Sequence, residues 1–156
     1  LSQGKALAVA AGHDDAIVIG ADSVGVLEGS VFGKPKDEAD ARDMLKKMSG
    51  KTHTFVSGLT VIDTAVGKEI SAVSETKVRF RQLSDEEISN YVATGESLHC
   101  AGSYAIQGKG ALLVESIEGE YSTILGISLN KLMTLLREFG VSMLVDPQER
   151  TTKARA

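Results

Sequence analysis

The pattern of apolar and polar positions predicts a chain in which helices alternate with antiparallel hairpins. Runs of strand character cover residues 16–27, 52–64, 68–80 and 111–117. Segments with helical spacing cover residues 2–11, 37–50, 84–95 and 128–139. This alternation favours one α/β unit, in which helices cover a mixed β-sheet.

Asp22 and Lys34 stand on either side of a predicted hairpin turn at residues 28–29. The glycine of this turn supplies the positive φ that a tight turn requires. With a strict two-residue loop, Ser23 lies opposite Lys34 and Asp22 lies opposite Pro35. A three-residue loop or a bulge would instead bring Lys34 onto the face of Asp22. In both registers the carboxylate and the amine lie near each other at the open end of the hairpin.

The chemistry of Asp22 and Lys34 leaves two interpretations. The carboxylate could hold a divalent cation or activate a water molecule while the lysine neutralises a phosphate oxygen. The alternative is a structural ion pair, because charge pairs are common at strand ends. Spacing alone does not choose between them.

The glycine-rich segment at residues 101–110, "AGSYAIQGKG", offers backbone N–H groups that no side chain shields. The amide of Gln107 can both donate to and accept from the edge of a nucleobase. The segment is not a Walker motif, because it lacks the glycine spacing and the Ser or Thr after lysine. An ordinary turn is the alternative interpretation.

Other reactive side chains favour structural roles. His53 and His99 do not have the spacing of a metal site, and Ser97 lacks the glycine that a nucleophile elbow requires after the serine. Neighbouring residues of an extended strand point to opposite faces, so His99 and Cys100 do not predict a thiolate–imidazolium pair. Cys100 is expected to be a small buried thiol.

Composition and charge exclude several classes of protein. The formal net charge of −4 and the isoelectric point near 5.4 argue against nucleic-acid binding, as does the lack of basic clusters with aromatic residues. The single cysteine excludes an internal disulfide and is compatible with a reducing cytosol. No apolar run reaches the roughly 18 residues of a membrane span, so we expect a cytoplasmic protein with no membrane partner.

Several motifs in fixed order resemble those of the Maf-type nucleotide pyrophosphatases, also called septum formation inhibitors. They are "VIGADSV", "LEGSVFGKP", "SGKTH", "LSDEEI", "YVATGE" and "AGSYAIQGKGALLVESIEGEYSTILGISL". The resemblance runs from residue 5 to about residue 140. It implies a twisted sheet in two lobes around a cleft, similar to the inosine triphosphate pyrophosphatases. Residues 1–146 would form the single domain, followed by a polar tail at 147–156.

The resemblance also implies an activity and the residues that carry it. The family hydrolyses a nucleoside triphosphate to the monophosphate and pyrophosphate with a divalent cation, Mg²⁺ or Mn²⁺, and such an enzyme would clear modified or surplus nucleotides. Asp22 matches the proposed proton acceptor and would contact the metal, while Lys5 and Lys34 would contact the phosphates. Ser23 and Gln107, followed by Gly108, match substrate-binding positions of the branch that acts on dTTP and UTP.

Some segments depart from the family pattern. The Ser-x-Ser-x-Arg-Arg loop that grips phosphates does not occur in the sequence, which reads as if it begins inside a folded unit. The segment "LHCAGS" resembles the branch that acts on 7-methyl-GTP, and Lys77 replaces a usual acidic residue. The alternatives are therefore a 7-methyl-GTP-type pyrophosphatase and a nucleotide-binding regulatory module without turnover. The sequence also leaves open whether the protein forms a homodimer.

Overall fold

A computed structural model describes residues 1–144 of the chain, so the predicted polar tail and the end of the predicted domain lie outside the described residues. The strands are β1 (Ile17–Leu27), β2 (Ser30–Phe32), β3 (Thr52–Asp63), β4 (Lys68–Phe80) and β5 (Val114–Glu118). The helices are α1 (Ser2–Ala10), α2 (Glu38–Met48), α3 (Asp85–Val92), α4 (Tyr121–Ile124) and α5 (Leu129–Glu138). Short 3₁₀ helices are η1 (Glu96–His99), η2 (Ala101–Ser103) and η3 (Lys109–Leu113).

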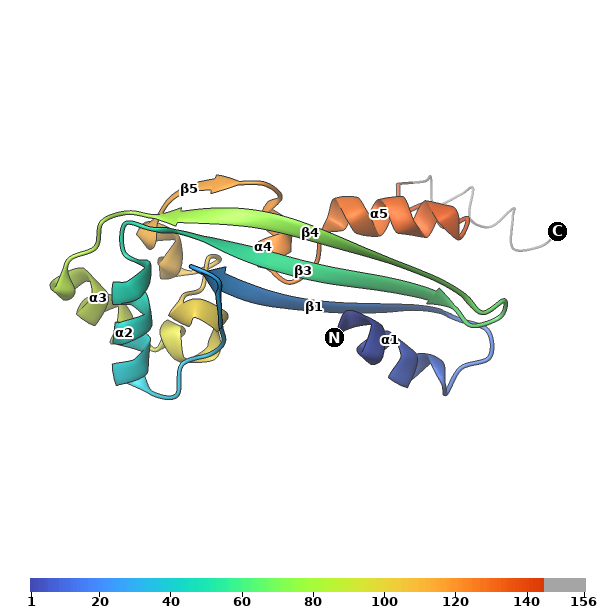
Figure 1. Ribbon diagram of the computed structural model, residues 1–156, viewed down its shortest axis with the longest axis horizontal. Helices are drawn as coiled ribbons and strands as arrows, with labels where there is room; N and C mark the ends of the chain where they lie inside the picture. The colour runs from blue at the N-terminus through green and yellow to red at the C-terminus, as the bar shows by residue number, and fades with distance from the viewer. Residues whose placement is uncertain (145–156) are drawn as a thin grey trace.

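The sheet has five strands in the order β2-β1-β3-β4-β5. Every described pairing in it is antiparallel. The long strands β1, β3 and β4 run along the long axis of the molecule, and helices lie at both of its ends (Figure 1). The prediction of an α/β unit with a helix-flanked sheet is confirmed.

The turn between β1 and β2 confirms the two-residue register. Leu27 pairs with Ser30, and the intervening Glu28 and Gly29 have φ values of 50° and 81°. Positive φ at both central residues is the geometry of a type I′ turn, whose twist matches that of the flanking strands. The pairing ends where Gly25 meets Phe32, so the chain beyond β2 leaves the sheet.

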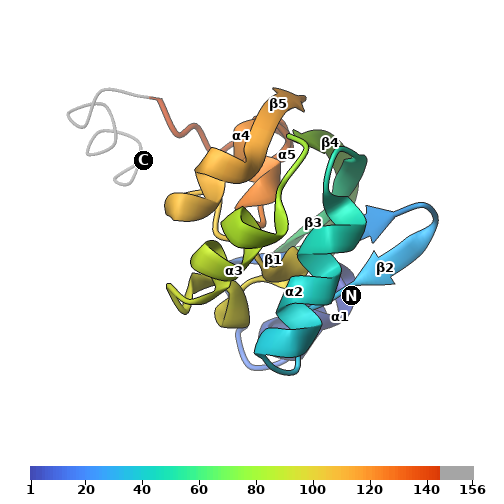
Figure 2. The same ribbon diagram turned by 90° about the vertical axis from the view of Figure 1, so that its left-hand side faces the viewer.

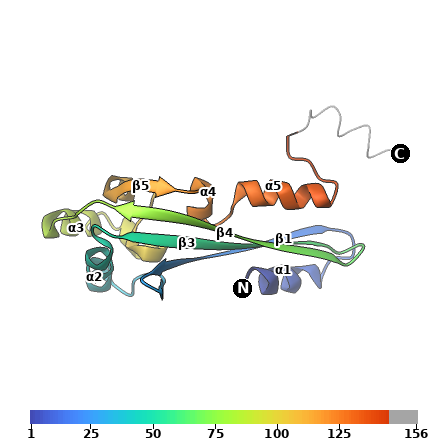
Figure 3. The ribbon, with the colours of Figure 1, turned by 45° about the horizontal axis from the view of Figure 1, so that its top comes forward.

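Of the three clusters of buried side chains among the described residues, the two larger ones lie at opposite ends of the sheet. The first joins one end of the sheet to α2 and α3, which pack side by side (Figure 2). Its members include Leu45, Met48, Phe55, Val78, Phe80, Ile88 and Tyr104. The second joins the other end of the sheet to α5 and contains Leu59, Val61, Leu132, Leu135 and Leu136. At that end α1 and α5 lie on opposite sides of the sheet (Figure 3).

Local capping signals in the sequence were sufficient to place three helices. Asp37 accepts a hydrogen bond from the backbone N–H of Asp40 and caps α2. Ser84 and Glu87 form the predicted capping box of α3. Ser128 caps α5. Each cap satisfies backbone donors that have no partner within the helix.

The strand expected at residues 111–117 begins later than the sequence suggests, and its predicted first part is wrong. The helix η3 extends to Leu113, and β5 starts at Val114. A Cβ on Gly110 would lie 2.6 Å from the carbonyl oxygen of Ala105, so the two backbone segments pack directly on each other. This tertiary contact turns the chain where its apolar side chains favour extension. The helix α4 was not predicted either.

Close approach of α1 to the sheet depends on a glycine in β1. A Cβ on Gly20 would lie 2.4 Å from the carbonyl oxygen of Ser2 and 2.7 Å from the Cβ of Ala6. Ala6 is fully buried, and the Ser2 hydroxyl lies 3.2 Å from the Thr60 hydroxyl on β3. The helix therefore rests on the strand backbone with no side chain between them.

We expect Gly20→Ala to lower the free energy of unfolding by about 1–3 kcal/mol, because the added methyl group has no space. Gly4→Ala on the facing helix is the matched control, since a Cβ there meets nothing within 4 Å. That change should raise the free energy of unfolding by about 0.5–1 kcal/mol through helix propensity. Urea denaturation of the three proteins measures both effects. A Gly20→Ala protein as stable as the wild type would contradict the close contact.

Candidate active site

The candidate site lies along the open edge of β1. The strand pairs with β2 only from Gly25 to Leu27, whereas it pairs with β3 from Ile17 to Val26. Within residues 1–144, the stretch of β1 before Gly25 therefore has a strand partner on one side only. This stretch contains Asp22 and Ser23.

Lys5 and Asp22 are brought together by the packing of α1 on β1. The Lys5 ammonium group forms an ion pair with the Asp22 carboxylate and donates to the carbonyl of Ala21 at 3.4 Å. The Lys5 side chain is 59% exposed and the Asp22 side chain 21% exposed. An ion pair this exposed contributes little to stability. Its charges remain within reach of a ligand.

Ser23 faces the other side of the sheet, because neighbouring strand residues alternate. Its hydroxyl donates to the carbonyl of Thr123 in α4 at 3.4 Å. Its cross-strand partner Ser57 donates to the carbonyl of Gly126 at 3.1 Å. The two serines thus tie the α4 segment to β1 and β3.

Glu120 holds the α4 segment in place and was missed by the sequence analysis. Its carboxylate accepts hydrogen bonds from the hydroxyls of Ser122 and Ser128 and from the backbone N–H of Asn130. Partial burial acts to raise the pKa of Glu120, but these hydrogen bonds outweigh it and the pKa is lowered. The sequence signal for this role was a glutamate that stands two residues before a serine in a turn-rich segment.

Gln107 lies at a pocket of about 240 Å³ on the α4 side of the sheet. The pocket is lined by Phe55, Cys100, Ala101, Tyr104, Ala105, Ile106, Gln107, Ile124 and Leu125. Apart from the Gln107 amide, the Tyr104 hydroxyl and the Cys100 thiol, its side chains are apolar. An apolar pocket with a few polar groups is typical of a site for a small molecule.

The loop that carries Gln107 is fixed from its outer side by α3 and η1. The Tyr91 hydroxyl accepts from the backbone N–H of Ala105 at 2.9 Å, and burial raises the pKa of Tyr91 to about 12. The Glu96 carboxylate accepts from the backbone N–H of Lys109 at 3.2 Å. A Cβ on Gly108 would lie 2.6 Å from this carboxylate, so Gly108 admits Glu96 and does not itself line the pocket.

Cys100 corrects the expectation of a buried thiol. The residue is partly exposed and lines the Gln107 pocket. Cys100 has an extended backbone, and the positive φ values of Gly102 and Ser103, 73° and 60°, turn the chain just after it; the sequence pattern gave no sign of this. His53 is buried, in agreement with the structural role expected for it.

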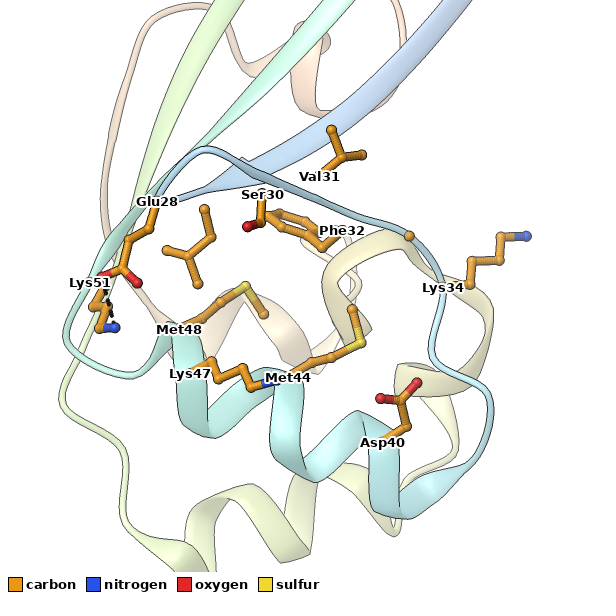
Figure 4. Close-up of a pocket in the computed structure, with 12 residues that line it drawn as sticks. Glu28, Ser30, Val31, Phe32, Lys34, Asp40, Met44, Lys47, Met48 and Lys51 are labelled. Carbon is orange, nitrogen blue, oxygen red and sulfur yellow. Dashed lines mark hydrogen bonds and ion pairs between the residues drawn. The ribbon is translucent and has the colours of Figure 1, made fainter.

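Lys34 lies beyond the end of β2 and is exposed. The carbonyl of Gly33 accepts from the backbone N–H of Gly102 at 3.0 Å, which places Lys34 beside the loop that forms the pocket. A separate groove of about 480 Å³ lies between the β1–β2 hairpin and α2. Figure 4 shows the Lys34 side chain at its margin, pointing away from Met44 and Met48 of α2. Among the described residues no ion pair or hydrogen bond joins Lys34 to Asp22.

Asp22 offers one hard oxygen group for a cation. The part of the chain that the structure describes has no group of three or more His, Cys, Asp or Glu side chains that could hold a metal ion. Mg²⁺ is commonly held by one or two carboxylates together with the phosphates of the substrate. The residues present therefore fit a cation that binds with a phosphate ligand, and they do not fit a site made of protein groups alone.

No helix among residues 1–144 has the length and apolar character needed to cross a membrane.

The arrangement has two parts on opposite faces of β1. Lys5 and Asp22 supply charge on the α1 face, and Ser23, Gln107 and the pocket lie on the α4 face. A ligand with an anionic end and an aromatic end could contact both by crossing the open edge of the strand.

Comparison with known proteins identifies the family of the chain. The sequence matches the family described as "Maf-like protein" over residues 1–139. A "dTTP/UTP pyrophosphatase" from Dictyoglomus turgidum is 51% identical over 140 residues, which cover 90% of this chain and 72% of that protein. A "dTTP/UTP pyrophosphatase" from Thermoanaerobacter sp. is 49% identical over 146 residues, which cover 92% of this chain and 76% of that protein.

A more distant relative, a "dTTP/UTP pyrophosphatase" from Methanococcoides burtonii, is 43% identical over 142 residues, which cover 91% of this chain and 73% of that protein. The family match spans all the candidate residues from Lys5 to Gln107, so the resemblance noted in the sequence is confirmed. This chain belongs to the Maf-like protein family.

Proposed function

We propose that this protein is a nucleoside triphosphate pyrophosphatase that acts on dTTP and UTP. The observation that carries the proposal is the Lys5–Asp22 pair at the open edge of β1, with the Gln107 pocket on the opposite face of that strand. Relatives about half identical to this chain are named for that activity. The reaction hydrolyses the anhydride between the α and β phosphates.

In this proposal Asp22 orients the attacking water and takes its proton. The water oxygen adds to the α phosphorus, the α–β anhydride bond breaks, and pyrophosphate leaves with the bonding electron pair. Lys5 and Lys34 reduce the negative charge on the phosphates as the bond breaks. Lys5 already lies beside Asp22, whereas Lys34 is exposed and lies beside the loop that forms the Gln107 pocket.

A divalent cation, Mg²⁺ or Mn²⁺, would bind between Asp22 and the phosphates. When bound, such a cation neutralises phosphate charge and makes water more acidic. Asp22 keeps its carboxylate partly exposed on the α1 face, where the cation and the phosphates could meet it.

The base would occupy the Gln107 pocket. A primary amide offers a donor and an acceptor together, which suits the adjacent carbonyl and N–H of thymine or uracil. The apolar side chains of Phe55, Ile124 and Leu125 would contact the faces of the ring. Ser23 lies beside the pocket through its hydrogen bond to α4.

A 7-methyl-GTP-type pyrophosphatase is the second candidate. The observation in its favour is that the segment "LHCAGS" supplies Cys100 and Ala101 to the pocket. A purine ring with an added methyl group is larger than a pyrimidine ring, so it would contact more of this apolar surface. Substrate ranking decides between the two candidates.

The first functional prediction concerns Asp22. Asp22→Asn should lower pyrophosphate release from UTP by about 100-fold or more, because an amide cannot take the proton. The melting temperature should change little, since the pair with Lys5 is exposed. Asp43→Asn is the matched control, because Asp43 is exposed on α2. A mutant with near wild-type turnover would remove Asp22 from the mechanism, and binding of UTP without any release would favour a nucleotide-binding module.

The second concerns Lys34. Lys34→Ala should weaken binding of a nonhydrolysable UTP analogue by about tenfold, since a charged hydrogen bond to phosphate contributes about 1.5–3 kcal/mol. Lys36→Ala, an exposed neighbour, should bind as the wild type does. Titration calorimetry measures both affinities. Equal affinities for the two variants would show that Lys34 does not contact the phosphates.

The third concerns Gln107 and substrate choice. Gln107→Glu should lower turnover of dTTP and UTP by about tenfold or more, because an unpaired acceptor in the pocket costs roughly 1–3 kcal/mol. The wild-type protein should prefer these pyrimidines to purine triphosphates and to 7-methyl-GTP. Rates measured for each nucleotide give the ranking. A wild-type preference for 7-methyl-GTP that Gln107→Glu leaves unaltered would favour the second candidate.

A further inference from the structure

His53 lies at the centre of a buried group of aromatic rings near the start of β3. It is 1% exposed, and its ring meets four others edge to face. The ring centroids lie 5.7 Å away for Phe32, 5.7 Å for Phe55, 5.0 Å for Phe80 and 5.6 Å for Tyr104. Edge-to-face contacts of this kind are favoured by the charge distribution of aromatic rings.

These rings come from separate segments of the chain, and two of the segments carry candidate site residues. Phe32 is the last residue of β2 and stands two residues before Lys34. Tyr104 stands three residues before Gln107 in the loop after η2. Phe32 also lies directly against Gly102, where a Cβ would approach its ring to 2.7 Å. His53 therefore contacts both the segment that carries Lys34 and the segment that carries Gln107.

His53 also makes a hydrogen bond that a purely apolar core residue could not make. Its Nε2 atom lies 2.9 Å from the Tyr104 hydroxyl, and both groups are buried. Burial lowers the pKa of His53 to about 4, so the ring is neutral near pH 7. Burial raises the pKa of Tyr104, so that hydroxyl keeps its proton. The other ring nitrogen, Nδ1, has no partner among residues 1–144.

Tyr104 and Phe55 both line the Gln107 pocket. A change in the position of the Tyr104 ring would therefore change the surface that a base meets. We propose that His53 is a positioning residue: through its hydrogen bond to Tyr104 it fixes the inner surface of the nucleobase pocket. This inference rests on the proposed function, because it assigns the pocket to the base.

Two simpler roles for His53 predict different behaviour. As a metal ligand, it would need further donors, and aromatic rings surround it instead. As a packing residue only, it could be replaced by an apolar side chain at a cost in stability and with no effect on nucleotide affinity. The experiment therefore has to separate affinity from stability.

His53→Leu places an apolar side chain at this position and removes both ring nitrogens. It should raise KM for UTP by about fivefold or more while kcat stays within about twofold, because the binding that is lost is equally strong in the ground state and the transition state. His53→Gln, which can place an amide nitrogen near Tyr104, should restore much of the affinity. Tyr104→Phe keeps the ring and removes only the hydroxyl, so it tests the same bond in a protein with its core nearly intact.

Leu132→Ala is the matched control for lost stability. Leu132 is 6% exposed and belongs to the core cluster between the sheet and α5, which contains none of the residues that line the pocket. It should lower the melting temperature and leave KM for UTP unchanged. Unchanged KM values in both His53→Leu and Tyr104→Phe would overturn the proposal.

A second readout does not depend on turnover. Cys100 is the only cysteine of the sequence and lines the same pocket, so its alkylation by iodoacetamide reports on pocket geometry. The labelling rate should rise in His53→Leu and Tyr104→Phe and stay unchanged in Leu132→Ala. If the wild-type protein turns over no triphosphate, the proposed function fails, while the labelling rates still decide the role of His53. Labelling rates equal to the wild-type rate in both His53→Leu and Tyr104→Phe would overturn the positioning role of His53.

Discussion

Pairing of β1 with β3 is the contact on which the rest of the site depends. It aligns ten residue pairs from Ile17 with Asp63 to Val26 with Thr54. In this register Gly20 faces α1, while Ser23 and its partner Ser57 face α4. A slip of one residue would exchange the two faces, because side chains alternate along a strand. The helix that carries Lys5 would then meet side chains where it now meets glycine.

This register also explains why the candidate residues are divided between two faces. Asp22 and Ser23 are neighbours in sequence, so a strand must direct them to opposite sides. The charged pair with Lys5 lies on one side and the Gln107 pocket on the other. β2 pairs with β1 only as far as Gly25, so the edge of β1 before that residue has no neighbouring strand on this side among residues 1–144. The two faces of β1 meet at this open edge.

Much of the fold could be predicted from local sequence signals. Alternation gave the long hairpin of β3 and β4, and the Glu28-Gly29 pair gave the turn that sets the β1–β2 register. Caps such as Ser84 with Glu87 gave the helix starts. These features depend on neighbours in sequence, so the pattern of residue types was enough.

Other features depend on contacts between distant segments, and the sequence pattern did not reveal them. The late start of β5 follows from the packing of Gly110 on Ala105, and the exposure of Cys100 follows from the turns around it. The role of Glu96 in holding the Gln107 loop could not be read from spacing. Family resemblance supplied the candidate residue Lys5, and amide chemistry singled out Gln107, whereas the relation of the two residues to one another came from the tertiary structure.

The open edge of β1 has a consequence for the behaviour of the protein in concentrated solution. A strand edge that is free to meet a ligand is also free to pair with the backbone of another molecule, which is a route to aggregation. Here Asp22 carries a charge on that strand, and the Lys5 ammonium group donates to the Ala21 carbonyl. Charged side chains on an edge strand oppose such pairing. The groups that we assign to catalysis thereby also help to keep separate molecules apart.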